Sequence, residues 1–175
     1  SIMGNVFDLT GRTAVVTGGS RGIGCAIAEL FLEHGAEVAI CHLGDHGNAE
    51  RFKDRMKIRG LELHTTECDV SDPAAVAAFT EWAQERMGSV DIVVNSAGLG
   101  GSDRLFTMTE DSDWDRIVGV NLRGTMLVTR AFFAAMVSRN YGRIINVASQ
   151  LAYKGAPGLA HYCAAKAGVV GFTRA

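Results

Sequence analysis

Strong charge, long apolar runs and metal-type cysteine spacings are all missing from this chain of 175 residues. The formal net charge is −2 and 21% of the residues are charged, so the sequence has no basic stripe for nucleic acid and no polybasic face for anionic lipid. Its longest apolar stretches, such as 131–137 and 142–148, are far too short to span a bilayer. The partners that remain are a small molecule or another protein.

Few side chains are placed to hold a metal. His42 and His46 are four residues apart but enclose Gly44 and Asp45 in an expected loop, so we expect no metal site there. The other histidines, His34, His64 and His161, are assigned no role. The four cysteines fall in no metal spacing, and we expect them to be small buried residues of a protein in the reducing cytoplasm: Cys25, Cys41, Cys68 and Cys163.

Strand and helix patterns alternate along the chain, and 47% of its residues are hydrophobic. Short β-rich runs predict strands at Thr13–Thr17, Glu37–Cys41, Leu61–Glu67, Val90–Asn95 and Arg143–Val147. The intervening segments predict helices at 23–34, 48–59, Pro73–Met87, 112–138 (capped by Ser112 to Asp115) and 160–175. This alternation predicts an α/β fold: a doubly wound parallel sheet with helices on both faces, formed by residues 1–175 as a single domain.

A glycine-rich turn, Thr17-Gly-Gly-Ser-Arg-Gly-Ile-Gly24, joins the first strand to the first helix. We expect Gly18 to allow a tight turn, and Gly22 and Gly24 to let the backbone approach a pyrophosphate at the helix N-terminus. A turn of this kind can also serve packing alone, but its place after the first strand favours a dinucleotide site. In doubly wound sheets the ligand lies at the carboxyl ends of the strands, where Asp69, Asn95 and Ser149 are also expected.

These motifs together resemble the short-chain dehydrogenase/reductase family, over the chain from about Asp8 to Ala175, and the resemblance implies a Rossmann-type fold. The resemblance rests on the glycine turn, Asp69, Asn95-Ser-Ala-Gly98, Asn121, Ser149 and Tyr162-Cys-Ala-Ala-Lys166. Ser96 departs from the family, which more often has a second asparagine there. The resemblance implies a nicotinamide cofactor bound by Gly18, Ser20, Arg21, Gly22, Ile23 and Gly24, with Asp69 and Val70 near the adenine, Asn95, Ala97 and Gly98 near its ribose, and Tyr162 and Lys166 near the nicotinamide.

Tyr162 and Lys166 are four residues apart and therefore share one face of the last expected helix. An ammonium beside a phenol favours the phenolate, so Tyr162 is suited to exchange a proton with a carbonyl or an alcohol. Ser149 can hydrogen-bond the same substrate oxygen. By resemblance, Lys166 also holds the nicotinamide ribose and Asn121 supports a water relay to it. Taken separately, a Tyr and a Lys four residues apart are more often a surface pair, a serine after a strand is more often part of a turn, and an asparagine within a helix is more often solvated. Together these residues predict a catalytic set.

The end of the second expected strand bears on the choice of cofactor. An acidic residue there binds the ribose 2′-hydroxyl and favours NAD, but His42 occupies that position and Asp45 comes later than the family pattern puts it. Arg21, helped by His42, could face a 2′-phosphate. We therefore favour NADP over NAD.

The nearest motifs are those of 3-oxoacyl-acyl carrier protein reductases of fatty acid biosynthesis, which implies a β-ketoacyl thioester substrate. Sugar, polyol and other secondary-alcohol dehydrogenases share nearly all of these residues, and a non-catalytic cofactor-binding relative stays open as an alternative. By resemblance, the helices around 118–137 and after His161 are buried between subunits of a homodimer or homotetramer. Family members continue into further strands, so we expect a chain truncated at its C-terminus, with an open edge at 143–147, weak stability and poor activity by itself.

Overall fold

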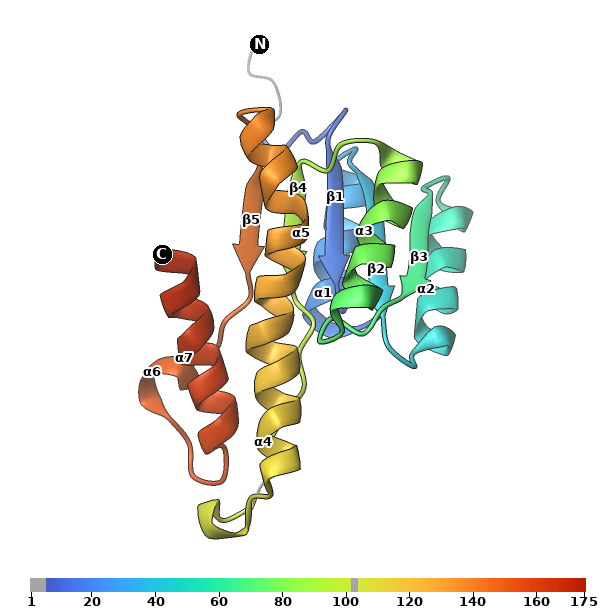
Figure 1. The fold of residues 1–175 in the computed structure, drawn as a ribbon. Coiled ribbons are helices and arrows are strands. Elements are labelled where there is room, and N and C mark those ends of the chain that lie inside the picture. The colour runs from blue at the N-terminus through green and yellow to red at the C-terminus, as the bar shows by residue number, and fades with distance from the viewer. Residues whose placement is uncertain (1–5, 102–103) are drawn as a thin grey trace.

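The computed structural model describes residues 6–101 and 104–175 and contains one five-stranded parallel sheet (Figure 1). Its strand order is β3-β2-β1-β4-β5. The bounds are β1 Thr13–Thr17, β2 Glu37–His42, β3 Leu63–Glu67, β4 Ile92–Asn95 and β5 Arg143–Asn146. All five expected strands are confirmed, with ends shifted by up to two residues.

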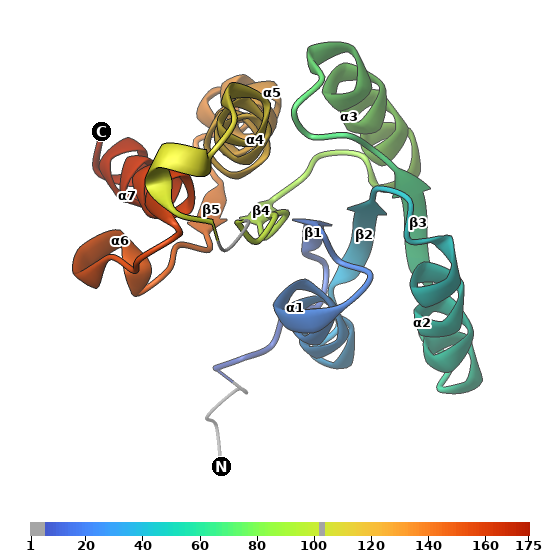
Figure 2. The same ribbon diagram turned by 90° about the horizontal axis from the view of Figure 1, so that it is seen from below.

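Helices cover both faces of the sheet (Figure 2). One face carries α1 (Gly22–Glu33) and α2 (His46–Ile58), and the opposite face carries α3 (Pro73–Met87) and α5 (Gly124–Ser138). Two buried clusters follow from this arrangement. One packs around Val15, Phe79 and Phe132, and the other around Val16, Ile40 and Phe52. The central strands are apolar on both sides because both sides are covered, as the expected doubly wound fold requires.

The helix expected at 112–138 contains a break that the sequence pattern did not predict. It begins one residue earlier as α4 (Asp111–Val118), widens into one π-helical turn at Gly119–Arg123, labelled η2, and continues as α5. The expected cap from Ser112 to Asp115 is wrong, since Glu110 is the N-cap residue and makes no side-chain capping bond. Single π turns of this kind are frequent at functional sites, and Asn121 lies inside this one.

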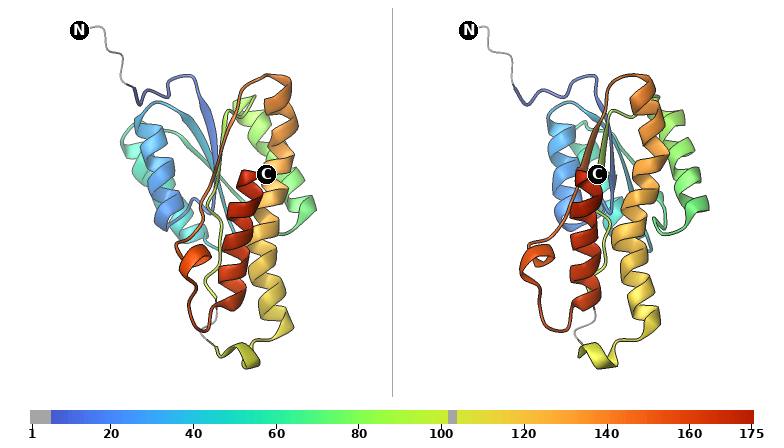
Figure 3. Two further views of the ribbon diagram at one scale, coloured as in Figure 1. Left: turned by 90° about the vertical axis from the view of Figure 1, so that its left-hand side faces the viewer. Right: turned by 60° about the vertical axis from the view of Figure 1, so that its left-hand side comes forward.

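Three further helical segments complete the fold. A 3₁₀ turn, η1 (Phe106–Met108), precedes α4, and α6 (Leu151–Lys154) was not predicted. The last helix, α7 (Ala160–Arg174), lies alongside α4 and the π turn (Figure 3). In the part of the chain that the structure describes, no helix is long and apolar enough to cross a membrane.

The strand order reverses between β1 and β4, because the chain builds outward to β3 and then returns to the other side of β1. Loops from adjacent strands therefore diverge at the carboxyl ends and leave a crevice there.

One edge of the sheet is formed by β5, which pairs with β4 alone among the described strands. Ile145 on this edge strand is 46% exposed.

Candidate active site

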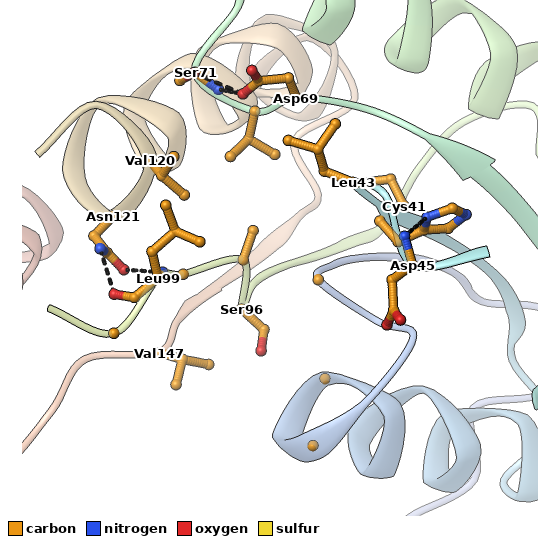
Figure 4. Close-up of a pocket in the computed structure, with 18 of the residues that line it drawn as sticks. Cys41, Leu43, Asp45, Asp69, Ser71, Ser96, Leu99, Val120, Asn121 and Val147 are labelled. Atoms are coloured by element: carbon orange, nitrogen blue, oxygen red, sulfur yellow. Dashed lines mark hydrogen bonds between the residues drawn. The ribbon is translucent and has the colours of Figure 1, made fainter. Parts of the chain in front are cut away.

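A cavity of about 630 Å³ lies in this crevice (Figure 4). It runs from the glycine turn across the ends of β2, β3 and β4 to the π turn and α7. Most of the residues expected at the site line it: Gly18, Ser20, Arg21, Gly22, Ile23, Gly24, His42, Asp69, Val70, Ala97, Gly98, Asn121, Tyr162 and Lys166. Two expected residues, Asn95 and Ser149, are not part of its lining.

The glycine turn is shaped by close backbone contacts. Gly18 has φ +62°, and a Cβ at this position would lie 2.8 Å from the Cα of Ala97. A Cβ on Gly24 would lie 2.3 Å from the carbonyl oxygen of Gly18. Side chains at these two positions would separate the turn from the first turn of α1 and from the loop after β4. Glycine is therefore required here for packing.

Gly22 differs from the other two, because a Cβ there would meet no atom within 4 Å. It has φ +57° and opens α1, whose N-cap residue Arg21 makes no side-chain capping bond. The first amides of α1 therefore face the cavity without a side chain covering them. A helix N-terminus exposed in this way attracts an anion such as a pyrophosphate.

The loop after β4 is tied to the glycine turn through Thr17. The Thr17 hydroxyl oxygen accepts hydrogen bonds from the backbone amides of Ser96 and Ala97, at 3.1 Å and 3.0 Å. Asn95 points elsewhere: its amide nitrogen donates to Thr129 on α5 and to Asn146 on β5. Asn95 is 4% exposed and thus connects the sheet to α5, while the backbone of Ala97 and Gly98 forms the cavity wall.

The loop after β3 forms the far end of the cavity. The Asp69 carboxylate accepts hydrogen bonds from the backbone amide and the hydroxyl of Ser71, which fixes the turn into α3 (Figure 4). Val70 is buried against Gly124 at the start of α5. Both side chains lie where the expected adenine subsite falls.

Asp45 is the acidic residue that sequence reasoning left out of the site. Its carboxylate accepts a 2.6 Å hydrogen bond from the Ser20 hydroxyl and a 2.8 Å bond from the Asn48 amide, and it lines the cavity. The Ser20 hydrogen bond lowers the pKa of Asp45, with the charge of Arg21 adding to the effect. In the sequence, Asp45 is a carboxylate three residues after His42. The loop after β2 turns this carboxylate back toward the glycine turn.

His42 is 5% exposed and forms part of the same wall. Its Nδ1 accepts the backbone amide of Asp45 at 3.3 Å, and its ring meets that of His46 edge-on. Burial lowers the pKa of His42, with the nearby His46 contributing. An imidazole whose Nδ1 accepts a hydrogen bond is neutral, so His42 contributes a donor but no positive charge to this wall.

Asn121 holds the loop after β4 against the π turn. Its amide nitrogen donates to the carbonyl oxygens of Leu99 and Ile117, both at 3.0 Å, and its Oδ1 accepts the amide of Leu99 at 3.2 Å. Gly98 lies between this side chain and Lys166, because a Cβ on Gly98 would be 2.6 Å from Asn121 Oδ1 and 3.8 Å from Lys166 Nζ.

Lys166 and Tyr162 come from one face of α7 and reach the cavity together. Lys166 is 6% exposed, and its Nζ donates a 2.9 Å hydrogen bond to the carbonyl oxygen of Val147. It lies 5.9 Å from the centre of the Tyr162 ring. Burial lowers the pKa of Lys166. The ammonium is thus fixed beside the phenol, as the spacing of the two residues predicts.

Ser149 lies just beyond the cavity lining, at the turn into α6. Its hydroxyl oxygen accepts the backbone amide of Leu151 at 3.1 Å. This contact uses the oxygen as an acceptor and leaves the hydroxyl hydrogen available to a ligand.

His161, to which the sequence analysis assigned no role, lies in the first turn of the helix that carries Tyr162. Its Nδ1 accepts the backbone amide of Tyr162 at 3.0 Å, one of the amides that the first turn of a helix leaves unpaired. The ring is 1% exposed and stacks on Trp114 of α4. His161 therefore fixes the start of α7 against α4.

The fold and this cavity define a dinucleotide-binding α/β protein, and comparison with known proteins defines the family. The family model for short chain dehydrogenases matches residues 12–175. The chain belongs to this family and is an oxidoreductase of the short-chain dehydrogenase/reductase type.

Similar proteins include the 3-oxoacyl-[acyl-carrier-protein] reductase FabG of Chlamydia muridarum, 36% identical over 95% of this chain and 67% of the relative. Nodulation protein G of Rhizobium sp. (strain N33) is 38% identical over 97% of this chain and 67% of its own length. Among solved structures, a putative short-chain alcohol dehydrogenase from Sinorhizobium meliloti 1021 matches with a TM-score of 0.91 and 36% identity, over 97% of this chain and 67% of that one. The chain thus spans about two thirds of the length of these relatives.

Proposed function

We propose that the protein interconverts a carbonyl and a secondary alcohol with a nicotinamide dinucleotide, using Tyr162 as the general acid and base. The observation that carries this proposal is the pairing of Tyr162 and buried Lys166 at one end of a cavity that the open N-terminus of α1 also lines. The uncovered amides around Gly22 and the backbone wall at Gly18 and Gly98 fit a pyrophosphate and its sugars. The nicotinamide ring supplies or accepts the hydride when bound.

The protein's own part is orientation and proton transfer. Tyr162 donates its phenolic proton to the oxygen of a carbonyl, or accepts one from an alcohol in the reverse direction. The Lys166 ammonium favours the phenolate that results, and its hydrogen bond to Val147 keeps it in place. The Ser149 hydroxyl donates to the same substrate oxygen. Asn121 positions the loop at Leu99 that adjoins Lys166 and supports a water relay to that lysine.

NADP is the nucleotide that we propose, on the strength of Arg21 and His42. Arg21 is exposed at the N-cap of α1 and its guanidinium can form a charge-assisted bond to a 2′-phosphate. His42 adds a neutral donor from the end of β2. NAD is the second candidate, and Asp45 is the observation that favours it: an ionised carboxylate in this wall accepts a ribose 2′-hydroxyl and repels a phosphate.

The ratio of kcat/KM for NADPH to that for NADH tests this choice. We expect a ratio above one, which falls about tenfold in Arg21→Ala because one charge-assisted bond is lost. Asp45→Asn removes the repelling charge and raises the ratio, while Asp54→Asn, at an exposed position of α2, leaves it unchanged. A preference for NADH that Asp45→Asn reverses would establish the second candidate.

A β-ketoacyl thioester carried by acyl carrier protein is the substrate class that we propose, because several relatives are named as 3-oxoacyl-[acyl-carrier-protein] reductases. A putative gluconate dehydrogenase with a TM-score of 0.90 and 31% identity supports a sugar or polyol as the alternative. NADPH oxidation with a β-ketoacyl thioester, a ketose and a simple ketone separates these classes. Nucleotide binding without turnover of any of them would instead favour a non-catalytic relative.

The proposal also covers the oligomeric state and the cellular location of the protein. We propose a homodimer or homotetramer that buries α5 and α7 between subunits, supported by exposed apolar side chains such as Phe133 and Val137 on α5. We place it in the cytoplasm, consistent with four cysteines that are all free. Light scattering of the purified protein tests the assembly, and a monomer at micromolar concentration would contradict it.

A further inference from the structure

Two cysteines meet at the far end of the cavity, away from Tyr162 and Lys166. Cys41 is the next-to-last residue of β2, and Cys68 directly follows β3. Cys41 pairs with Thr66 in the parallel register, so Cys68, two residues further on, points to the same face of the sheet. The backbone amide of Cys68 continues the ladder by donating to His42. Both thiols belong to one buried cluster, and both line the cavity.

Cys41 is also joined to the glycine turn. Its carbonyl oxygen accepts the backbone amide of Gly19 at 3.1 Å, and its sulfur faces the amide of Gly18. Figure 4 shows Cys41 beside Leu43 and Asp45 on the wall of the cavity. A change at this sulfur therefore acts on the turn that is expected to hold the pyrophosphate.

The two thiols are not equivalent. Cys41 is 1% exposed, and the neighbouring Cys68 thiol together with burial raises the pKa of Cys41. Cys68 receives the hydrogen bond from Cys41, which lowers the pKa of Cys68 although burial and Asp69 oppose the effect. Cys68 is 5% exposed and lines the cavity, so it is the more accessible sulfur of the pair. The thiolate is the form that attacks electrophiles, and the lowered pKa of Cys68 favours that form.

We propose that Cys68, supported by Cys41, is a modification site for peroxides and thiol-directed electrophiles, and that its modification and nucleotide binding exclude one another. The exclusion rests on the proposed function, because Cys68 immediately precedes Asp69 and Val70 at the expected adenine subsite. With hydrogen peroxide, the Cys68 sulfur attacks one oxygen and the O–O bond breaks. The sulfur is oxidised to a sulfenic acid, and the peroxide is reduced to water. With N-ethylmaleimide, a C–S bond forms and the thiol proton passes to the ring carbon.

The test uses a Cys25→Ser/Cys163→Ser background, which removes the two cysteines that do not line the cavity. The rate of labelling by N-ethylmaleimide is followed by intact mass and peptide mapping. We expect Cys68 to react before Cys41. In Cys41→Ala the rate at Cys68 falls several-fold, because the group that lowers the pKa of Cys68 is lost, and Cys41→Ser restores the rate by supplying another donor.

Protection by nucleotide fragments locates the site. ADP, which carries the adenosine half, is expected to slow labelling of Cys68 at least tenfold at saturation, whereas nicotinamide mononucleotide leaves the rate unchanged. Equal reaction of both cysteines, or equal rates with and without bound ADP, would overturn the inference. Titration calorimetry on the unlabelled protein separates the two claims: if no nucleotide binds, the proposed function fails, while the order of reaction and its dependence on Cys41 still test the thiol site.

Discussion

Gly98 is the residue at which the nucleotide side of the cavity meets the proposed catalytic side. Its Cα lies so close to Asn121 and Lys166 that a Cβ would be 2.6 Å from Asn121 Oδ1. The Asn121 side chain is itself fixed by three hydrogen bonds and cannot yield freely. Gly98→Ala should therefore displace Asn121 and cost about 1–3 kcal/mol of unfolding free energy, as overpacking does.

Steady-state kinetics and urea denaturation of Gly98→Ala check this expectation. The matched control is Gly100→Ala in the same loop, where a Cβ would meet no atom within 4 Å. We expect Gly100→Ala to keep the stability of the parent. Equal stability of the two variants would show that Asn121 is not held as tightly as its contacts indicate.

Lys166 gives a prediction about pH, because burial lowers its pKa in the folded protein. An unfolded lysine keeps a pKa of about 10.4, so between the folded and unfolded values the unfolded chain binds more protons. The free energy of unfolding contributed by Lys166 therefore rises with pH through this window. Activity should fall over the same window, since the neutral amine no longer favours the Tyr162 phenolate.

The measurement compares the parent with Lys166→Met at pH values from 7 to about 10.4, the unfolded value. The difference in unfolding free energy between the two should grow in favour of the parent as pH rises. Lys166→Arg keeps its charge throughout and should shift the alkaline loss of kcat/KM to higher pH. An alkaline limb identical in the parent and in Lys166→Arg would remove Lys166 from the proton-transfer step.

At the residue scale, sequence reasoning placed the glycines, Tyr162 and Lys166 correctly in one cavity, because strand ends and helical spacing determine where they lie. Asp45 was discounted, since the path of the loop that returns it to Ser20 depends on contacts that no local pattern encodes. The direction of the Asn95 side chain likewise depends on Thr129, which is 34 residues away in the sequence.

The π turn is the element that most directly joins the fold to the site. Within it, the Asn121 amide donates to Leu99 and Ile117, so the widened turn and the loop after β4 hold one another. Asn121→Ala leaves those groups unpaired and should cost about 1–3 kcal/mol of unfolding free energy, together with a large loss of kcat.

Thr125→Val provides the comparison for this element. The Thr125 hydroxyl donates to the Asn121 carbonyl oxygen at 3.2 Å, one helical turn away from the Asn121 side chain that lines the cavity. Its removal should lower stability slightly and leave kcat intact, as measured by urea denaturation and by the rate of NADPH oxidation. A parallel loss of kcat in both variants would mean that helix stability, and not the Asn121 contacts, limits turnover.

The regular helices and strands were largely predictable from the sequence, whereas the π turn that interrupts the long helix and the short helix α6 were not. The helix Pro73–Met87 was predictable because proline favours the first turn of a helix, and the structure adds the Asp72 side chain as a cap that accepts the amide of Ala74. The π turn was missed because its residues have an ordinary helical pattern, and only the contacts of Asn121 with Leu99 explain it. The short helix α6 is too brief for periodicity to reveal.

For the whole molecule, the order of the strands creates the site by separating the loops after β1 and β4. Alternating strands and helices predicted a parallel sheet with two covered faces, but they did not predict the order of the strands, since pairing between strands is not local in sequence. The two cores, around Phe132 and around Phe52, hold the strand ends in a fixed relation to one another. The cavity is therefore a property of the fold, and the side chains at its two ends form the proposed nucleotide and substrate subsites.

The measurement that tests the central claim most directly is single-turnover oxidation of bound NADPH by a ketone in the parent and in Tyr162→Phe, with nucleotide affinity measured in both. The phenylalanine variant keeps the ring beside Lys166 and lacks only the proton to be transferred. We predict unchanged NADPH affinity and a rate reduced by about 10²–10⁴-fold, the usual contribution of general acid catalysis. An unchanged rate in Tyr162→Phe would contradict the account.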